Sequence, residues 1–201
     1  PFMMLMGTKL CQLVSLSMVQ GTLAFFTLRV LKASDRLLGN LTLVQTVCTV
    51  VMVPVWVKIS KRIGKRNAYM IAASLYGVSM STWFFSGPTE SEFLIYGRMF
   101  FTGIGASGQL LLAASMLPDT MEYDYRRTGL RREGIFSGIY TTIEKVSFAL
   151  GVTILGTFLG AMGYVQSTGA NVEQPASAIT ALYICIGAAP ITGAITSCLF
   201  L

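Results

Sequence analysis

Charged residues divide this sequence into six long apolar stretches, and that division restricts the fold more than any other feature. Each stretch approaches the roughly 20 residues that a helix needs to cross a hydrocarbon core of ~30 Å. Charged residues make up 12% of the chain, against about 25% in soluble domains, so they cannot coat a water-facing surface. The sequence predicts an all-α polytopic membrane protein with transmembrane helices near 8–29, 37–57, 67–87, 93–117, 134–164 and 176–201.

The charges between these predicted helices alternate in sign. The loops predicted at 58–66 and 119–133 are rich in Lys and Arg, whereas the third loop carries only Glu90 and Glu92, and the last only Glu173. Because Lys and Arg accumulate on the cytoplasmic side, we expect both ends of this chain to face the cytoplasm. One loop departs from the pattern with a mixed set, Arg29, Lys32, Asp35 and Arg36.

The residue inventory excludes several classes of function. The chain has no His, so catalytic triads, zinc-binding HExxH helices and imidazole proton shuttles are excluded. Its four Cys are widely spaced in apolar runs, as expected of buried reduced thiols and not of a metal site. The net charge of +6 lies in short clusters at predicted helix ends, which argues against nucleic acid as a partner. No enzyme is predicted, because an intramembrane protease would need a Ser-His pair or paired aspartates.

Several small-residue motifs lie inside predicted helices. Gly103, Gly105 and Gly108 match the dinucleotide fingerprint GxGxxG, but they lie in an apolar span where small residues favour close helix packing. The GxxxG pairs 134/138 and 156/160 favour the same interpretation, with a hinge as the alternative. Prolines at 54 and 190 indicate a kinked helix or, alternatively, a broken one that exposes carbonyls to a cavity.

Two charges interrupt the fifth apolar stretch. Lys145 lies twelve residues beyond Glu133, or roughly 18 Å along a helix, which is too deep for easy snorkelling. An ionised side chain near the bilayer centre costs about 2.5–3.5 kcal/mol by insertion scales, so it indicates a functional site. We expect Lys145 to contact substrate or the coupling ion, with a structural ion pair as the alternative. Spacings of four, four and three place Ser137, Thr141, Lys145 and Phe148 in one polar stripe on a helix face, with Tyr140 and Glu144 beside it.

A partner is also expected for Glu144. Adjacent residues point about 100° apart on a helix, so Glu144 and Lys145 do not form a simple salt bridge. Arg98 enters the fourth predicted helix from the opposite side, and we expect it to pair with Glu144.

Residues 116–151 resemble the glycoside-pentoside-hexuronide:cation symporters of the major facilitator superfamily, the branch that contains the melibiose permease. The resemblance rests on Pro118-Asp119, Glu122-Tyr123, Gly129, the run Arg131-Arg132-Glu133-Gly134, and Lys145. It implies that residues 1–201 form one half of the bundle, the C-terminal six-helix half, without the N-terminal half.

The family resemblance also implies a function, a cation-coupled symporter of a sugar or glycoside working by alternating access in the cell membrane, the inner membrane if bacterial. It implies a substrate site at Tyr140, Thr141, Glu144 and Lys145, although Tyr140 replaces the amide of melibiose permease. The implied cytoplasmic gate consists of Asp119, Glu122, Arg131, Arg132 and Glu133.

The expected partners are a small-molecule substrate, a monovalent cation, the bilayer and the N-terminal half. The coupling cation, Na+ or H+, would be bound mainly by that N-terminal half, and no other cofactor or metal is expected. Two alternatives remain: a symporter of a lysophospholipid or other amphiphile from the same family, and a structural membrane protein that transports nothing.

Overall fold

The computed structural model describes residues 2–165 and 174–200, and every regular element in these ranges is helical. Glu173, predicted in the last loop, lies outside the described residues. A 3-10 turn, η1 (Thr82–Phe85), continues α3, and a π turn, η2 (Ile184–Ala188), joins the last two helices into one rod. The helices are α1 (Phe2–Arg29), α2 (Asp35–Ile63), α3 (Lys65–Ser81), α4 (Glu92–Thr128), α5 (Glu133–Ala161), α6 (Ala176–Tyr183) and α7 (Ala189–Leu199).

These elements form six rods in the described chain, as the apolar stretches predict. α1, α2, α4, α5 and the joined α6–α7 are each long and apolar enough to cross a membrane. α3 has 17 residues, and the four residues of η1 extend it to 21, which also spans about 30 Å.

Two stretches that the sequence predicts as loops are largely helical. α2 continues to Ile63, and one residue, Gly64 with φ 84°, separates it from α3. α4 continues through Pro118 to Thr128 and ends at Gly129 with φ 69°. Lys and Arg favour helices and are stabilised at helix C-termini, so basic residues prolong these helices beyond the apolar stretch. The left-handed backbone that ends both helices suits glycine.

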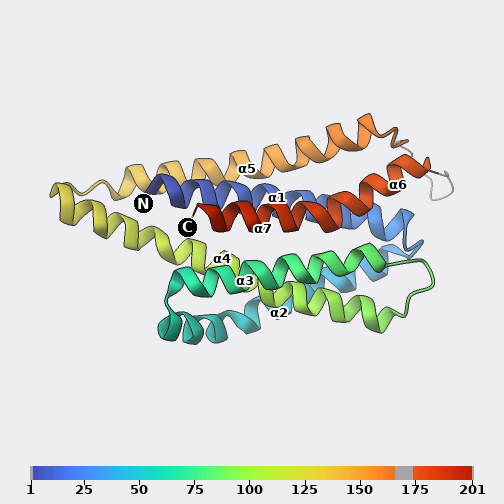
Figure 1. Ribbon diagram of the computed structural model, residues 1–201, viewed down its shortest axis with the longest axis horizontal. Helices are drawn as coiled ribbons and strands as arrows, with labels where there is room; N and C mark the ends of the chain where they lie inside the picture. Colours follow the sequence, from blue (N-terminus) through green and yellow to red (C-terminus); the bar gives the residue numbers. More distant parts are fainter. Residues whose placement is uncertain (1, 166–173, 201) are drawn as a thin grey trace.

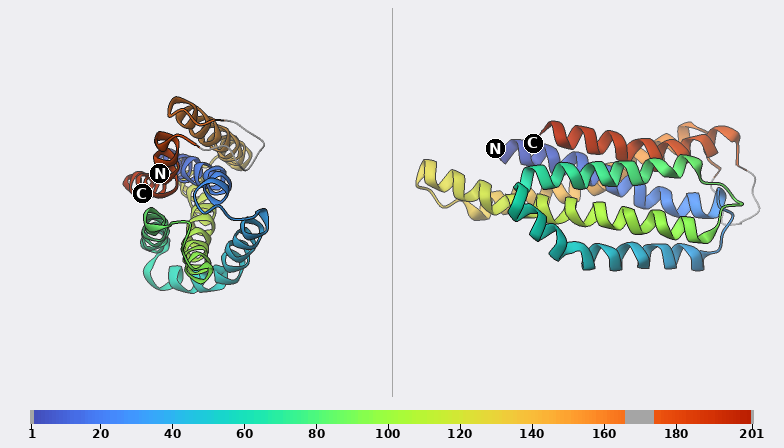
Figure 2. Two further views of the ribbon diagram at one scale, coloured as in Figure 1. Left: turned by 90° about the vertical axis from the view of Figure 1, so that its right-hand side faces the viewer. Right: turned by 60° about the horizontal axis from the view of Figure 1, so that its bottom comes forward.

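The rods pack as two groups of three (Figure 1). α4 lies against α2 and α3, and α1 lies against α5 and α7. The first helix of each half of the sequence, α1 or α4, therefore packs mainly against helices of the other half. Because successive rods run in opposite directions, the first three rods of the sequence and the last three have inverted orientations, as in many transporter repeats. Seen along the rods, α1 and α4 lie at the centre, with α2 and α5 flanking them on one side (Figure 2).

Both described chain ends lie at the same end of the bundle (Figure 1). The Gly64 turn and the turn at 129–132 are also at this end, so most of the Lys and Arg residues gather there. The turns at 30–34 and 86–91 lie at the opposite end. We call these the basic end and the opposite end of the bundle.

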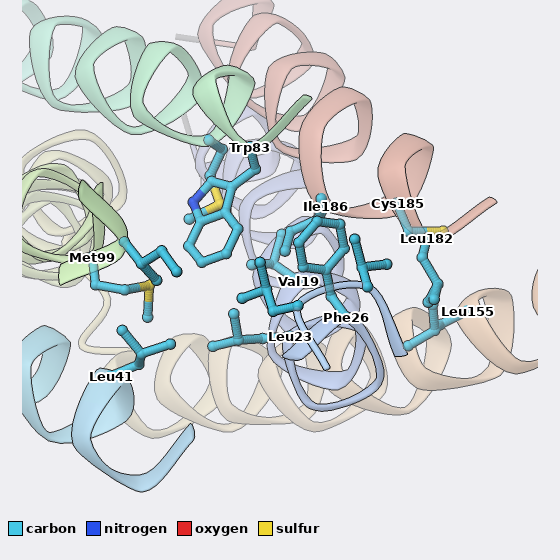
Figure 3. Close-up of a cluster of buried hydrophobic side chains, with 14 of the residues drawn as sticks. Val19, Leu23, Phe26, Leu41, Trp83, Met99, Leu155, Leu182, Cys185 and Ile186 are labelled. Carbon is cyan, nitrogen blue, oxygen red and sulfur yellow. The ribbon is translucent and has the colours of Figure 1, made fainter. Parts of the chain in front are cut away.

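An apolar core joins the two groups of helices toward the opposite end. Trp83 and Phe26 are fully buried, and their ring centroids lie 5.6 Å apart in an edge-on contact. Phe26 also contacts the Tyr183 ring at 5.1 Å. Figure 3 shows Trp83 between α4 and the side chains of α1, so one aromatic ring links η1, α4 and α1.

The glycines of α4 confirm the packing role of the GxGxxG motif. A Cβ at Gly103 would lie 2.9 Å from the carbonyl oxygen of Gln45 on α2, and one at Gly105 would lie 2.6 Å from the backbone nitrogen of Tyr76 on α3. A Cβ at Gly108 would collide with Trp56 at 2.6 Å. Close approach of three helices therefore explains the motif, and no nucleotide site is needed.

The GxxxG pairs of α5 do not pack in this way within the described chain. A Cβ at any of the positions 134, 138, 156 and 160 would meet nothing within 4 Å. The tight contact on this helix occurs instead at Gly151, where a Cβ would collide with Ser17 and lie 2.6 Å from the carbonyl oxygen of Val14 on α1. The prediction of close packing at the two pairs was therefore wrong for the contacts described, because they lie off the face that meets α1.

Both prolines predicted to interrupt helices lie in continuous rods. Pro54 is inside α2, which continues on either side of it. Pro190 follows the π turn and occupies the second position of α7. A π turn beside a proline accommodates its missing N–H donor, so the rod bends without a break.

Candidate functional site

A buried lysine on α1 pairs with a carboxylate on α5. The Lys9 ammonium lies 2.7 Å from Oε2 of Glu144, and the Lys9 side chain is 6% exposed. The same ammonium lies 3.0 Å from the centroid of the Tyr140 ring. We call Lys9, Tyr140 and Glu144 the α1–α5 charge cluster.

The helical geometry of α5 explains this arrangement. Tyr140 and Glu144 are four residues apart and therefore share one face. Ser147 and Gly151 continue that face and are buried. The Phe2 and Phe136 rings, with centroids 4.4 Å apart, close the contact at the basic end. α1 and α5 thus run parallel along this seam, with the charge cluster as its polar part.

Within the charge cluster, the positive charge of Lys9 on α1 is balanced by Glu144. A buried ammonium needs a counter-charge, and the carboxylate of Glu144 supplies one at hydrogen-bond distance. The Tyr140 ring adds a cation–π contact, which strengthens when water is excluded. The Glu144 side chain remains 46% exposed, so part of its carboxylate stays accessible.

Lys9 is a site residue that the sequence analysis missed. The first helix is predicted near 8–29, which places Lys9 at its very start, where a charge is expected. The signal was nevertheless present, because residues 2–7 are uncharged and mostly apolar, and the helix begins at Phe2. Lys9 therefore lies about two turns inside α1, with apolar sequence on both sides of it.

Thr141 and Lys145 lie beside the charge cluster and outside its contacts. Both are exposed in the described chain. The Thr141 hydroxyl donates a hydrogen bond to the carbonyl of Ser137, one turn earlier. Lys145 makes no hydrogen bond or ion pair among the described residues. The predicted polar stripe on α5 is therefore present. Tyr140 and Glu144 beside it meet α1, whereas Ser137, Thr141, Lys145 and Phe148 are exposed in the described chain.

The pairing predicted between Arg98 and Glu144 was wrong. Arg98 instead binds Glu90 through both terminal nitrogens, at 2.6 Å each, and donates a further hydrogen bond to the hydroxyl of Ser86. The turn at 86–91 folds back over the start of α4 and brings the Glu90 carboxylate to Arg98. Glu144 lies well away on α5 and is already bonded to Lys9.

Two of the predicted gate residues form ion pairs within this chain. Asp119 on α4 accepts a hydrogen bond of 2.6 Å from Lys65 at the start of α3, and Lys65 also donates to the carbonyl of Ser115 at 2.9 Å. Glu122 pairs with Arg126, one turn further along α4, at 2.7 Å. All four charged side chains are at least 39% exposed. Exposed pairs of this kind contribute about 0–1 kcal/mol to stability.

The other three gate residues surround the turn between α4 and α5. The Arg131 guanidinium lies 5.2 Å from the centroid of the Tyr125 ring. Arg132 immediately precedes α5, and Glu133 is its first residue. The structure brings these residues to the basic end without joining them to the charge cluster.

The described residues contain no group of three or more His, Cys, Asp or Glu side chains that could hold a metal ion. The ionic groups near the cluster are two ammoniums and one carboxylate. Such a set can bind and orient a polar ligand by charge and hydrogen bonds.

Six apolar rods in the described chain, with a buried ammonium paired to a carboxylate between two of them, define a multi-pass membrane protein. The chain belongs to the MFS/sugar transport protein family, whose model matches residues 1–201.

Three similar proteins illustrate the range of this family. An uncharacterized symporter of Synechocystis sp. is 27% identical over 192 residues, 94% of this chain. A glucuronide carrier protein homolog of Escherichia coli is 30% identical over 168 residues, 83% of the chain. A sphingosine-1-phosphate transporter of Mus musculus is 26% identical over 195 residues, 94% of the chain. The matched region covers 35%, 36% and 37% of these relatives, so the chain spans about a third of their length.

The Arg98–Glu90 pair generates a prediction about stability. The two side chains are only 15% and 10% exposed, so Glu90→Gln leaves a buried guanidinium without its counter-charge. Breaking a buried pair in this way costs about 3–5 kcal/mol, and we expect a clear fall in the thermal unfolding temperature of the purified protein. The matched control is Glu92→Gln, which removes an exposed carboxylate two residues away and should cost less than about 1 kcal/mol. Equal unfolding temperatures for the two variants would show that the pair contributes little.

Proposed function

We propose that this chain forms part of a cation-coupled secondary transporter that moves a sugar or glycoside by alternating access. Membership of the MFS/sugar transport protein family supports this proposal. So do the names of its relatives, which include a symporter and a glucuronide carrier homolog. The proposed function involves no covalent chemistry, in keeping with a site made only of charged and hydroxyl groups.

The observation that carries the proposal is the ammonium of Lys145, which has no partner among the described residues and lies on a face of α5 that they leave uncovered. In the most apolar part of each helix, 22% of α5 and 17% of α2 are buried by the rest of the described chain, against 56% of α4. An ammonium about 18 Å from the start of α5 is costly against lipid, so its face should line a water-filled path. Tyr140, Thr141 and Glu144 would contact substrate beside Lys145 on that path.

The remainder of the transport path would come from outside this chain. We propose that an N-terminal six-helix half covers the exposed faces of α2 and α5. The relatives are about three times as long as the matched region, which leaves room for such a half. The coupling cation, Na+ or H+, would bind mainly there, because the charges near Lys145 are predominantly positive.

The basic end would face the cytoplasm and carry the inner gate. Most Lys and Arg residues gather at that end, as the positive-inside rule requires. The Lys65–Asp119 pair would hold α3 and α4 in position. Glu122, Arg131, Arg132 and Glu133 would pair with the other half when the cytoplasmic side closes.

A second candidate substrate is an amphiphile. The sphingosine-1-phosphate transporter aligns with 94% of this chain, as much as the symporter of Synechocystis does. An amphiphile would place its polar group at Lys145 and its apolar chain along the apolar residues of α5.

Lys145 provides the direct test of the transport proposal. In vesicles containing the full-length protein, Lys145→Gln should reduce accumulation of the transported sugar at least tenfold, because it removes the charge that binds the substrate. The sugar is first identified with the wild type, from a panel of labelled glycosides and hexuronides. Lys32→Gln, in the exposed turn at the opposite end, is the matched control and should leave uptake unchanged. Normal accumulation by a Lys145→Gln protein that reaches the membrane would contradict the proposal.

The Lys65–Asp119 pair tests the proposed gate. Lys65→Asp places two carboxylates together, and we expect it to lower the initial uptake rate several-fold. The double variant Lys65→Asp/Asp119→Lys restores opposite charges and should recover most of that rate. If the double variant is as slow as the single one, the attraction between these side chains does not support the gate.

A further inference from the structure

We propose that the start of α3 binds an anionic phospholipid of the bilayer at the basic end. The lipid phosphate lies among Lys61, Arg62 and Arg66, and one acyl chain follows a groove on the outer face of α3. This inference rests on the place proposed above for the N-terminal half, and it depends neither on the substrate nor on any transport step.

The outer face of α3 carries an apolar groove of about 560 Å³. Its lining residues recur every three or four positions, so they form one stripe along the helix. Four of the six are exposed in the described chain and the other two are half-buried. They are Asn67, Met70, Ile71, Ser74, Leu75 and Val78. No charged residue occurs between positions 67 and 89, so this stripe suits hydrocarbon.

The length of the groove matches the depth of one bilayer leaflet. Asn67 and Val78 are eleven residues apart, or roughly 16 Å along the helix axis. The acyl chains of one leaflet cover half of a hydrocarbon core of ~30 Å, about 15 Å. At Leu75 and Val78 the stripe also borders a second groove, of about 590 Å³, between α3 and the start of α4. A lipid whose headgroup is level with the start of α3 can therefore place one chain along the stripe.

Basic residues surround the mouth of this groove. Lys65 pairs with Asp119, but four other basic residues near Gly64 are exposed and form no ion pair among the described residues. These four are Lys58, Lys61, Arg62 and Arg66. Arg66 precedes the groove residue Met70 by four positions, so it lies on the same face one turn nearer the basic end. Basic clusters beside a membrane-spanning helix attract anionic lipid headgroups.

The N-terminus of α3 adds hydrogen-bond donors at the same place. α3 begins at Lys65, and no side chain among the described residues caps it. The backbone N–H groups in the first turn of a helix lack intrahelical acceptors and carry the positive end of the helix dipole. A phosphate there accepts hydrogen bonds from these groups and from the guanidinium of Arg66. One helix thus binds both the headgroup and the acyl chain.

This face of α3 is turned away from the interface proposed for the N-terminal half. α4 packs extensively against both α2 and α3, whereas α2 and α3 contact each other much less (Figure 2). α3 therefore lies on the far side of α4 from α2. A half that covers α2 and α5 leaves the stripe of α3 to the bilayer, so the bound lipid stays outside the transport path.

Native mass spectrometry of the full-length protein in detergent tests the headgroup. Palmitoyl-oleoyl phosphatidylglycerol and phosphatidylcholine have the same acyl chains and differ in headgroup charge. We expect the first phosphatidylglycerol to bind at least fivefold more tightly than phosphatidylcholine. Arg62→Gln/Arg66→Gln should remove most of this preference, because it removes two cations at the mouth of the groove.

The matched control for charge is Arg126→Gln/Arg127→Gln, which removes two exposed cations from the last turn of α4, also at the basic end. It should keep the preference for phosphatidylglycerol. Equal losses in the two double variants would show attraction to the overall positive charge and would overturn the site.

A second variant tests the position of the acyl chain. Ser74→Trp places a large side chain across the middle of the stripe and should weaken phosphatidylglycerol binding at least threefold. Thr196→Trp, on an exposed position of α7 outside the groove lining, is the matched control and should leave binding unchanged. Ser74→Leu, with a smaller expected loss, serves if Ser74→Trp does not fold. Unchanged binding in the folded Ser74 variant would contradict the proposed groove.

The remaining outcomes separate this inference from the transport function. Equal binding of the two lipids overturns it, and so does efficient cross-linking of Ser74→Cys between two copies in membranes, which would assign the groove to a second copy of the chain. Both results leave the transport proposal intact, because lipid binding is measured without any transported ligand. A protein that prefers phosphatidylglycerol but transports no labelled sugar would contradict the transport proposal alone.

Discussion

The ion pair between Lys9 and Glu144 is the interaction on which the rest of this site depends. It joins two parallel helices through residues 135 positions apart in sequence, with a hydrogen bond of 2.7 Å. A buried ammonium is tolerated only with a counter-charge, so Glu144 is held on the inner face of α5. Once Glu144 is held there, the next residue, Lys145, projects about 100° away and has no partner in the described chain.

The Arg98–Glu90 and Lys9–Glu144 ion pairs have different surroundings. Arg98 and Glu90 close the turn at 86–91 with two hydrogen bonds, next to the Trp83 core, and neither side chain is more than 15% exposed. In the α1–α5 charge cluster the carboxylate remains 46% exposed and borders an uncovered helix face. The first pair is therefore suited to stability, and the second to contact with a ligand.

Much of the fold could be predicted from the sequence, because lipid imposes simple rules on composition. The six apolar stretches correspond to six rods, and the GxGxxG motif packs α4 against α2 and α3. Helix ends were less predictable, since basic residues prolong helices into the region taken for loops. The GxxxG pairs of α5 make no close contact within the described chain, because spacing alone does not show which face of a helix meets a neighbour.

The charged contacts between helices could be predicted only in part. The polar stripe of α5 follows from helical spacing, but the partner of Glu144 depends on how α1 lies against α5. Lys9 was overlooked because the first helix was predicted to begin near residue 8, whereas α1 begins at Phe2. Arg98 was misassigned because the turn at 86–91 brings a nearer carboxylate. Partners distant in sequence are fixed by tertiary packing, which one sequence does not show.

The most direct measurement is the accessibility of position 145 to water. In a cysteine-free background of the full-length protein, Lys145→Cys should react with a charged, membrane-impermeant thiol reagent. Ser147→Cys, fully buried against α1, is the matched control and should remain unlabelled. Labelling of Lys145→Cys by lipid-soluble reagents alone would place this face of α5 against lipid and contradict a transport path beside the charge cluster.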